Sequence, residues 1–349
     1  MRVAIIGYGL AGRVFHGRLL AATAGFRVVA IVTGDEERRR AARSDFPQAR
    51  VVADADDLWR HADDFDLVVI ATNTGSHVEL ALRAIDARKP AVVDKPIATT
   101  ADDARRLVVA SDAQGVLIVP FHNRRWDSDF LTLRRVLADG ELGDPLRFES
   151  RFDRWKPTPS AAAWREQLPA HEGGGVLLDL GPHLVDQALL GFGPATSVYG
   201  EVFSRRSGAD DDVFIALTHE SGVTSHLWAN LLAGQPGPRM RLLGRRGTLV
   251  IDDPDGQEDA LRAGTRAGDP DFGVEHESRW GRIVAGDASH SIARSRGAWT
   301  RFYVDLRECL QHSTPPPVDV MDAVHGLDVL DAARQSAQLR RVVTLSATS

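Results

Sequence analysis

Met1-Arg2-Val3-Ala4-Ile5-Ile6-Gly7-Tyr8-Gly9-Leu10-Ala11-Gly12 opens the chain, and it decides how the rest is interpreted. A continuous apolar run ends in three glycines spaced G-x-G-x-x-G, which is typical of a buried strand that turns into a helix. Gly7 would permit the tight turn, Gly9 would leave room for a pyrophosphate, and Gly12 would let the helix pack closely on the strand. Glycine clusters also occur in ordinary turns, so the motif needs support from its surroundings.

Strands and helices alternate after this motif. Helices are expected over residues 13–24, 53–61, 77–87 and 100–114, and strands over residues 26–32, 67–72, 90–94 and 115–120. This alternation predicts a parallel sheet with right-handed crossovers, whose ligands bind at the carboxyl ends of the strands. We therefore expect a Rossmann dinucleotide-binding domain over residues 1–120, with Gly7, Tyr8, Gly9, Leu10, Ala11 and Gly12 beside the cofactor.

The later part of the chain has a different pattern. Short alternating runs at residues 197–203, 213–218, 223–230, 239–243 and 247–251 predict an antiparallel meander. Residues 252–298 show little periodicity and are expected to form a surface loop or lid, and helices are expected at 299–311 and 322–339. The predicted fold class is α/β: the Rossmann domain, then a C-terminal α/β domain over residues 121–349 with a large, mainly antiparallel open sheet.

Composition excludes several classes of protein. The 349 residues include 42 basic and 48 acidic side chains, and the net charge of −6 argues against a nucleic-acid partner. No apolar stretch is long enough to cross a bilayer, and Met1 leads directly into a strand, so we expect a cytoplasmic protein without a membrane partner. Cys309 is the only cysteine, which excludes an intramolecular disulfide and a multi-cysteine zinc site. No metal site is predicted.

The residues at the end of the second strand should determine whether the cofactor is NAD or NADP. Thr33 and Gly34 stand where a ribose-binding carboxylate is usual, Asp35 could still serve NAD, and Arg38 could accommodate the additional phosphate of NADP. Arginines 38–40 could equally form a solvated helix face. We expect NADP, with NAD possible.

Two further loops contribute candidates for cofactor binding. Thr72 ends the 67–72 strand, and Asn73 and His77 follow it. A position at the start of the next helix could equally explain His77. Asp94 and Lys95 end the 90–94 strand, and a lysine placed there could polarise a substrate oxygen or share its proton.

The domain junction supplies most of the candidates for substrate binding. Asn123 and Arg124 lie at the junction, where ligand clefts are common, and Trp155 lies further along. Asp179 and His183 have the i, i+4 spacing of one helix face, which would let the carboxylate orient the imidazole. Pro182 argues for a kink or a helix start nearby. Mere stabilisation of a helix is the alternative for this pair.

Gly7-Tyr8-Gly9-Leu10-Ala11-Gly12, Asp94-Lys95-Pro96 and Asp179-Leu180-Gly181-Pro182-His183 together resemble the glucose-fructose oxidoreductase, inositol dehydrogenase and rhizopine-catabolism (Gfo/Idh/MocA) family. The resemblance covers essentially the whole chain and is greatest to the scyllo-inositol dehydrogenase branch. It implies that Lys95 and His183 act on a substrate hydroxyl with help from Asp179, and that Asn73, His77 and Asp94 lie near the nicotinamide or ribose. The family commonly has Glu at the position of Asp94, so the cofactor contact of this shorter side chain stays open.

Three functions compete at this point. The first is an NAD(P)-dependent dehydrogenase that acts on the CH–OH group of a cyclic polyol or sugar. The second uses transient oxidation for glycosidic cleavage or epimerisation. The third is a non-catalytic regulator that senses dinucleotide, against which Lys95, Asp179 and His183 argue. The resemblance also implies a homodimer or homotetramer.

Overall fold

The computed structural model describes residues 1–160, 163–206 and 208–345. Its first part is a six-stranded parallel sheet in the order β3-β2-β1-β4-β5-β6. The strands are β1 (Arg2–Ile6), β2 (Arg27–Val32), β3 (Arg50–Val52), β4 (Leu67–Ile70), β5 (Ala91–Asp94) and β6 (Ile118–Phe121). Five of these strands match the predicted ones. The β3 strand was missed because three half-buried residues are too short to give a pattern.

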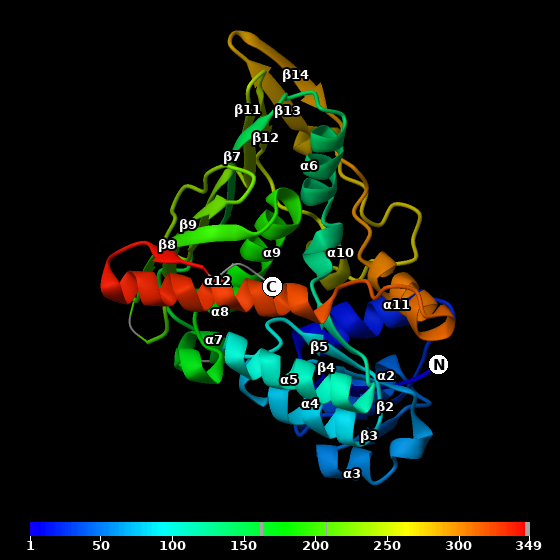
Figure 1. The fold of residues 1–349 in the computed structure, drawn as a ribbon. Helices are drawn as coiled ribbons and strands as arrows, with labels where there is room; N and C mark the ends of the chain where they lie inside the picture. Colours follow the sequence, from blue (N-terminus) through cyan, green and yellow to red (C-terminus); the bar gives the residue numbers. More distant parts are fainter. Residues whose placement is uncertain (161–162, 207, 346–349) are drawn as a thin grey trace.

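Helices cover both faces of this sheet, as the predicted alternation requires. A π-type helical segment, η1 (Ala11–Gly17), continues into α1 (Arg18–Ala22), and α2 (Glu36–Asp45), α3 (Ala55–Trp59), α4 (His77–Asp86) and α5 (Ala101–Gln114) follow. The side chains of Asp35, Asp54 and Thr100 cap the starts of α2, α3 and α5 by accepting backbone N–H groups. The first sheet and its helices form the lower part of Figure 1.

The second part is built on a nine-stranded sheet in the order β14-β13-β12-β11-β7-β10-β9-β8-β15. The strands are β7 (Pro145–Asp153), β8 (Ala195–Phe203), β9 (Asp212–His219), β10 (Thr224–Asn230), β11 (Met240–Gly244), β12 (Thr248–Ile251), β13 (Gly281–Ala285), β14 (Ala288–Ile292) and β15 (Val343–Thr344). Every pair is antiparallel except β7 with β10. The predicted α/β fold class is confirmed. The simple meander was wrong, because β7 inserts between β10 and β11.

The predicted loop at residues 252–298 was also wrong in part. It contains α10 (Gln257–Arg262) and the hairpin of β13 and β14, which extends the sheet. The side chains of β14 are mostly exposed, so the hairpin lacks the alternation of buried and exposed residues by which a strand is recognised.

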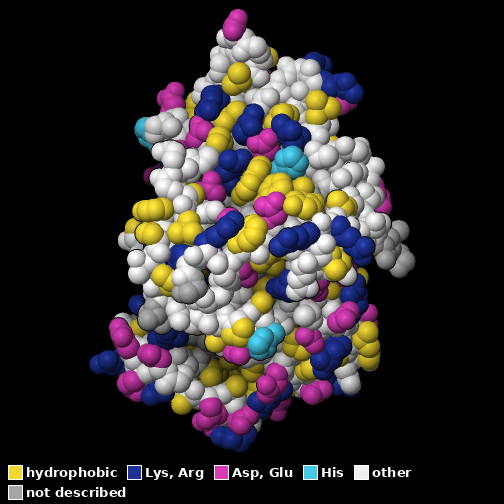
Figure 2. Space-filling model, turned by 90° about the vertical axis from the view of Figure 1, so that its left-hand side faces the viewer, with side chains coloured by type: hydrophobic (Ala, Val, Ile, Leu, Met, Phe, Trp, Pro, Cys, Tyr) yellow, Lys and Arg dark blue, Asp and Glu magenta, His cyan; other side chains and the backbone are white. Residues whose placement is uncertain are grey.

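One face of the nine-stranded sheet is covered by α9 (Gly181–Phe192) and α12 (Val320–Leu339). A Cβ on Gly200 would lie 2.4 Å from the carbonyl oxygen of Ala333, so α12 packs directly on β8. The other face is open and carries aromatic side chains. The ring centres of Phe214 and Trp228 lie 5.2 Å apart, and the guanidinium of Arg151 lies above the Trp228 ring. Figure 2 views the molecule from the side on which these strands lie outermost, and hydrophobic and basic side chains mix there.

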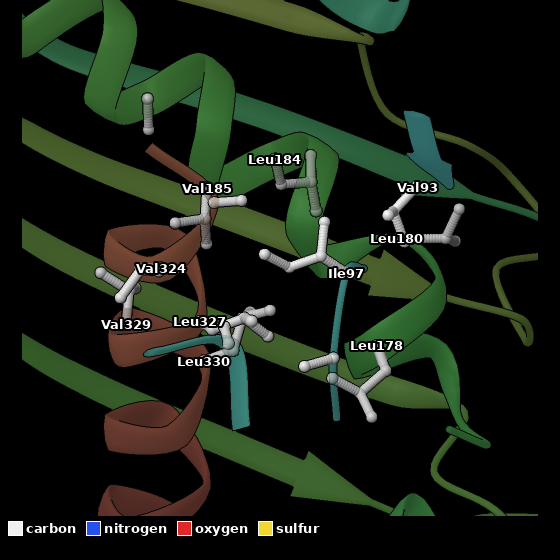
Figure 3. Close-up of a cluster of buried hydrophobic side chains, with 14 of the residues drawn as sticks. Val93, Ile97, Leu178, Leu180, Leu184, Val185, Val324, Leu327, Val329 and Leu330 are labelled. Carbon is white, nitrogen blue, oxygen red and sulfur yellow. The ribbon is translucent and has the colours of Figure 1, made fainter. Parts of the chain in front are cut away.

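The two parts share a continuous hydrophobic core. In Figure 3, Val93 and Ile97 from the end of β5 lie beside Leu180 and Leu184, and α12 closes the cluster. The α8 helix (Val176–Asp179) lies at this junction. Polar contacts reinforce it, since Asp331 on α12 accepts the backbone N–H of Ala101 at 2.9 Å.

The chain crosses this junction more than once. The α6 helix (Ser128–Ala138) follows β6, and the short α7 helix (Trp164–Gln167) lies between β7 and α8. The α11 helix (Thr300–His312) packs on α1, where Phe302 and Tyr303 join a core with Val3 and Ile5 of β1. Although α11 lies within residues 121–349, it therefore covers the first sheet. Within the described residues, no helix combines the length and the apolar character that a membrane span needs.

Candidate active site at the junction of the two sheets

A cavity of about 870 Å³ lies at the carboxyl ends of the first-sheet strands and extends to the second sheet. Most of the predicted site residues line it: Gly7, Tyr8, Gly9, Leu10, Ala11, Thr33, Gly34, Arg38, Thr72, Asn73, Asp94, Lys95, Asn123, Arg124, Asp179 and His183. Four do not, namely Gly12, Asp35, His77 and Trp155. The structure therefore brings together loops that are widely separated in the sequence.

The glycine loop has the shape that a dinucleotide requires. Gly7 has a φ of +94°, and a Cβ there would lie 2.4 Å from the carbonyl oxygen of Ala71. A Cβ on Gly12 would lie 1.9 Å from the carbonyl oxygen of Gly7, so Gly12 serves the strand–helix packing rather than the cavity. A Cβ on Gly9 would meet only the Arg38 guanidinium, at 3.7 Å. The space beside Gly9 is open and bordered by a cation, which fits a phosphate-containing cofactor.

The end of β2 gives Asp35 and Arg38 different roles. Asp35 caps α2, with its carboxylate accepting the backbone N–H of Arg38 at 2.9 Å, and it does not line the cavity. One oxygen of this exposed carboxylate is therefore used in the cap, and the role of Asp35 as a ribose ligand stays a prediction. Arg39 is occupied as well, since it pairs with Glu36. Arg38 is thus the cation of this helix that faces the cavity.

The loop after β4 gives the two candidates Asn73 and His77 different surroundings. Asn73 lines the cavity, and its Oδ1 accepts a hydrogen bond from Ser76 Oγ at 2.9 Å. His77 is buried, and its Nδ1 lies 2.8 Å from the carbonyl oxygen of Pro96. Burial lowers the pKa of His77. The prediction that His77 binds the cofactor is not supported, because the ring ties α4 to the loop after β5 instead of lining the cavity.

Lys95 is held at the centre of the cavity wall. Its Nζ donates to the backbone carbonyl of Asp179 and lies 3.1 Å from the carboxylate Oδ1 of the same residue. Asp94 is buried beside it, with Oδ1 accepting the backbone N–H of Lys95 at 2.9 Å. Burial lowers the pKa of Lys95, and the charge of Asp179 opposes this shift. The ammonium group is thereby more acidic than an ordinary lysine.

The segment that carries Asp179 and His183 is not one helix. Asp179 ends α8, Leu180 breaks the helix, and α9 begins at Gly181 with Pro182 in its first turn. Proline is favoured in a first turn because its missing N–H needs no partner there. The predicted shared helix face is therefore wrong, and the predicted helix start near Pro182 is right.

Asp179 contacts cations rather than the imidazole. Besides Lys95, it pairs with Arg165 at 3.0 Å. Burial would raise the pKa of Asp179, but Lys95, Arg165 and Arg154 together hold it far below its usual range. The expectation that Asp179 orients His183 is wrong, since both carboxylate contacts go to cations from other segments.

His183 lies on the same cavity wall as a neutral base. It is 5% exposed, its ring edge faces Phe152 at 6.3 Å between ring centres, and Nδ1 has no hydrogen-bond partner among the described residues. Burial and the charges of Lys95 and Arg124 hold the pKa of His183 well below its ordinary value. A neutral imidazole that lines the cavity can accept a proton from a ligand.

The junction residues have distinct surroundings. Asn123 is buried and lines the cavity, while Arg124 pairs with Asp127 at 3.1 Å and with Glu258 at 3.0 Å. Trp155 does not line the cavity and is 62% exposed. Its strand extension turns that side chain outward, so this cavity does not support its role in substrate binding, which stays a prediction.

Sequence reasoning missed several charged residues of the cavity. They are Asp54, Arg154, Lys156, Arg165, Glu166, Asp210, Glu258 and Arg262. Arg154 and Lys156 flank Trp155, and period-two alternation could have indicated that they share the opposite side of the strand from it. Glu258 and Arg262 lie in α10, within the stretch interpreted as a loop. Across the described ranges, no group of three or more His, Cys, Asp or Glu side chains is arranged to hold a metal ion.

Comparisons with known proteins agree with this geometry. Residues 1–122 match the family described as the oxidoreductase family with an NAD-binding Rossmann fold, and residues 130–250 match the one described as the GFO/IDH/MocA C-terminal domain. The chain is 31% identical to scyllo-inositol 2-dehydrogenase (NADP(+)) IolW of Bacillus subtilis, over 99% of this chain and 96% of that protein. It is also 31% identical to D-apiose dehydrogenase of Paraburkholderia graminis, over 92% of this chain and 84% of that protein.

Solved structures show the same fold. The oxidoreductase yvaA from Bacillus subtilis superposes with a TM-score of 0.92 at 30% identity, covering 99% of this chain and 98% of that one. The YPO2259 oxidoreductase from Yersinia pestis gives a TM-score of 0.91 at 33% identity, covering 100% of this chain and 98% of that one.

Proposed function

Because this chain belongs to the Gfo/Idh/MocA family of NAD(P)-binding oxidoreductases, we propose that it transfers a hydride between a nicotinamide and a ring hydroxyl or ketone of a cyclic polyol or sugar. The observation that carries the proposal is a single cavity with a glycine loop on one wall and Lys95, Asp179 and His183 on another. Scyllo-inositol is the first substrate to test, since the relative IolW is named for it. D-apiose, for which a second relative is named, is the next.

The proposed chemistry divides between the cofactor and the chain. When bound, the nicotinamide accepts or supplies the hydride. In the oxidation direction, the hydroxyl proton passes to the imidazole of His183, which is neutral before the reaction. Lys95 donates a hydrogen bond to the same substrate oxygen, and Asp179 holds the ammonium group in place. In the reduction direction, the protonated imidazole of His183 returns the proton to the new alkoxide.

NADP is the proposed cofactor. Asp35 is occupied as a helix cap, and Arg38 lies beside the open space at Gly9. An arginine at this edge can pair with the phosphate that distinguishes NADP from NAD. The naming of IolW as an NADP enzyme supports the same choice. Gly7, Tyr8, Gly9, Leu10, Ala11, Thr33, Gly34, Thr72, Asn73, Asp94 and Asn123 are proposed to line the remainder of the cofactor site.

A substrate panel tests the proposal directly. Inositols, aldoses including D-apiose, and short polyols are incubated with NADP or NAD, and formation of the reduced cofactor is followed by absorbance. We expect signal from at least one cyclic polyol or sugar, and more with NADP. Stoichiometric reduced cofactor distinguishes a dehydrogenase from an enzyme that oxidises transiently. If the dinucleotide binds and no member of the panel reacts, the dehydrogenase proposal fails in favour of a sensor.

The open face of the nine-stranded sheet is a candidate contact surface between copies of this chain. Its aromatic side chains and the arginine above Trp228 form a surface suited to a second copy. We propose a homodimer or homotetramer through this face, which light scattering tests. Cytoplasmic localisation stays a prediction.

A further inference from the structure

The main cavity continues toward a second one at the carboxyl end of β7 in the nine-stranded sheet. This second cavity, of about 500 Å³, shares Arg124, Arg154, Lys156, Glu258 and Arg262 with the first. Lys95, Asp179 and His183 line only the main cavity, whereas Arg151 and Arg239 line only the second. The shared residues therefore form a boundary beyond the proposed reacting centre, and most of them are cationic.

Two acids near Arg154 are already paired, namely Glu258, which both cavities share, and Asp179 of the main cavity. Asp179 has Lys95 and Arg165 as partners, and Glu258 has Arg124 and Arg262. Each carboxylate therefore contacts two cations.

Arg154 and Lys156 take part in none of these ion pairs. Neither has a side-chain hydrogen bond or ion pair to any residue in the described part of the chain. The charge of Arg154 nevertheless lowers the pKa values of both Asp179 and Glu258, so it acts on the space between them. Unpaired cations beside a cavity attract an anion.

Both cations are displayed by a backbone that is held firmly. Past the end of β7, Arg154 and Lys156 donate their backbone N–H groups to the carbonyls of Asn230 and Leu231, each at 2.8 Å. Arg206 donates to the carbonyl of Lys156 at 2.7 Å. Arg154 and Lys156 alternate with the outward-facing Trp155 and so share the side that lines the cavity. A fixed backbone lowers the conformational entropy that is lost when an ion binds to side chains on it.

We infer that Arg154 and Lys156 bind an anionic substituent, a carboxylate or a phosphate, on the polyol or sugar whose hydroxyl lies at Lys95 and His183. This inference rests on the proposed function and narrows its substrate class to acidic polyols or sugars. A guanidinium pairs with carboxylate or phosphate oxygens through two parallel hydrogen bonds, and the ammonium of Lys156 at the rim adds a point charge.

Matched substrates test the inference. Glucose, glucuronate and glucose phosphate are compared by kcat/KM with NADP, because they differ in the anionic group and in its kind. We expect one of the acidic sugars to exceed glucose by about 10- to 100-fold, as a charge-assisted hydrogen bond implies. The acidic sugar with the higher kcat/KM shows whether the site prefers a carboxylate or a phosphate. A neutral sugar that reacts as well as both acidic ones overturns the inference while leaving the proposed function intact.

Variants assign the preference to these residues. Arg154→Gln and Lys156→Gln should each reduce the ratio of kcat/KM for the acidic sugar over glucose by about tenfold. Arg134→Gln removes an exposed charge on α6 and is the matched control, with an unchanged ratio. An unchanged ratio in both cavity variants overturns the inference. So does a loss of NADP affinity in Arg154→Gln equal to the loss of kcat/KM, because Arg154 would then serve the cofactor.

A binding measurement keeps the test independent of turnover. Calorimetry of the NADP-saturated protein with glucuronate, glucose phosphate and glucose should show tighter binding of an acidic sugar, which Arg154→Gln weakens. If no member of the full substrate panel is oxidised and an acidic sugar still binds through Arg154, the proposed reaction fails and the anion site stands. If the acidic sugars bind no better than glucose, the anion site fails.

Discussion

The carboxylate of Asp179 lies 3.1 Å from Nζ of Lys95, although these residues come from different domains of the sequence. This contact fixes the end of β5 against the end of α8. It also sets the charge at the reacting centre, because the carboxylate favours the protonated lysine while burial disfavours it.

Replacing Asp179 by Asn should make Lys95 more acidic. The pKa of Lys95 is already lowered by burial, and loss of the carboxylate removes the principal opposing charge while Arg165 remains. The basic limb of the pH profile of kcat/KM should therefore move to lower pH. A basic limb at the wild-type position would contradict the assignment of this limb to Lys95.

Replacing His183 by Ala should reduce kcat by about 10²- to 10⁴-fold, the usual contribution of a positioned acid–base group. The affinity for NADP, measured by calorimetry, should change little because the glycine loop is untouched. His171→Ala is the matched control, since that side chain is exposed. A variant with nearly full kcat would exclude His183 as the proton acceptor.

Replacing Lys95 by Met should lower kcat to a similar extent. The double variant Lys95→Met, Asp179→Asn should be little worse than the more impaired single variant, because the two residues act as one pair. Strictly multiplicative losses would show that they act independently.

Replacing Arg38 by Ala should lower the ratio of kcat/KM for NADP over NAD by about tenfold or more, because a charge-assisted phosphate contact is lost. Arg40→Ala, an exposed neighbour on α2, provides the control. An unchanged ratio in Arg38→Ala would place the selectivity elsewhere.

Two glycine variants should fail in different ways. Gly9→Val fills open space, so the protein should fold and lose dinucleotide binding. Gly12→Ala places a Cβ 1.9 Å from the Gly7 carbonyl and should cost about 1–3 kcal/mol of stability through overpacking. Thermal unfolding and NADP calorimetry separate these effects. A Gly9→Val protein that binds both dinucleotides normally would remove the cofactor assignment.

The amino-acid sequence by itself determined the fold class, the glycine loop and most of the residues that line the cavity. These features follow from local rules: the period of apolar residues, the spacing of glycines, and the chemistry found at strand ends. Gly9, Arg38, Lys95 and His183 could be selected because each lies in a short motif that places it at the carboxyl edge of the sheet.

Only the tertiary structure decided how the side chains pair. Whether Asp35 caps α2, and whether Asp179 faces His183 or Lys95, depends on partners and helix breaks that spacing does not reveal. Arg154 and Lys156 became visible as a pair only when Asp179 and Glu258 were found to be neutralised by other cations. Which cations remain without an ion-pair partner is decided by the whole junction, because it depends on distances between segments that are far apart in the chain.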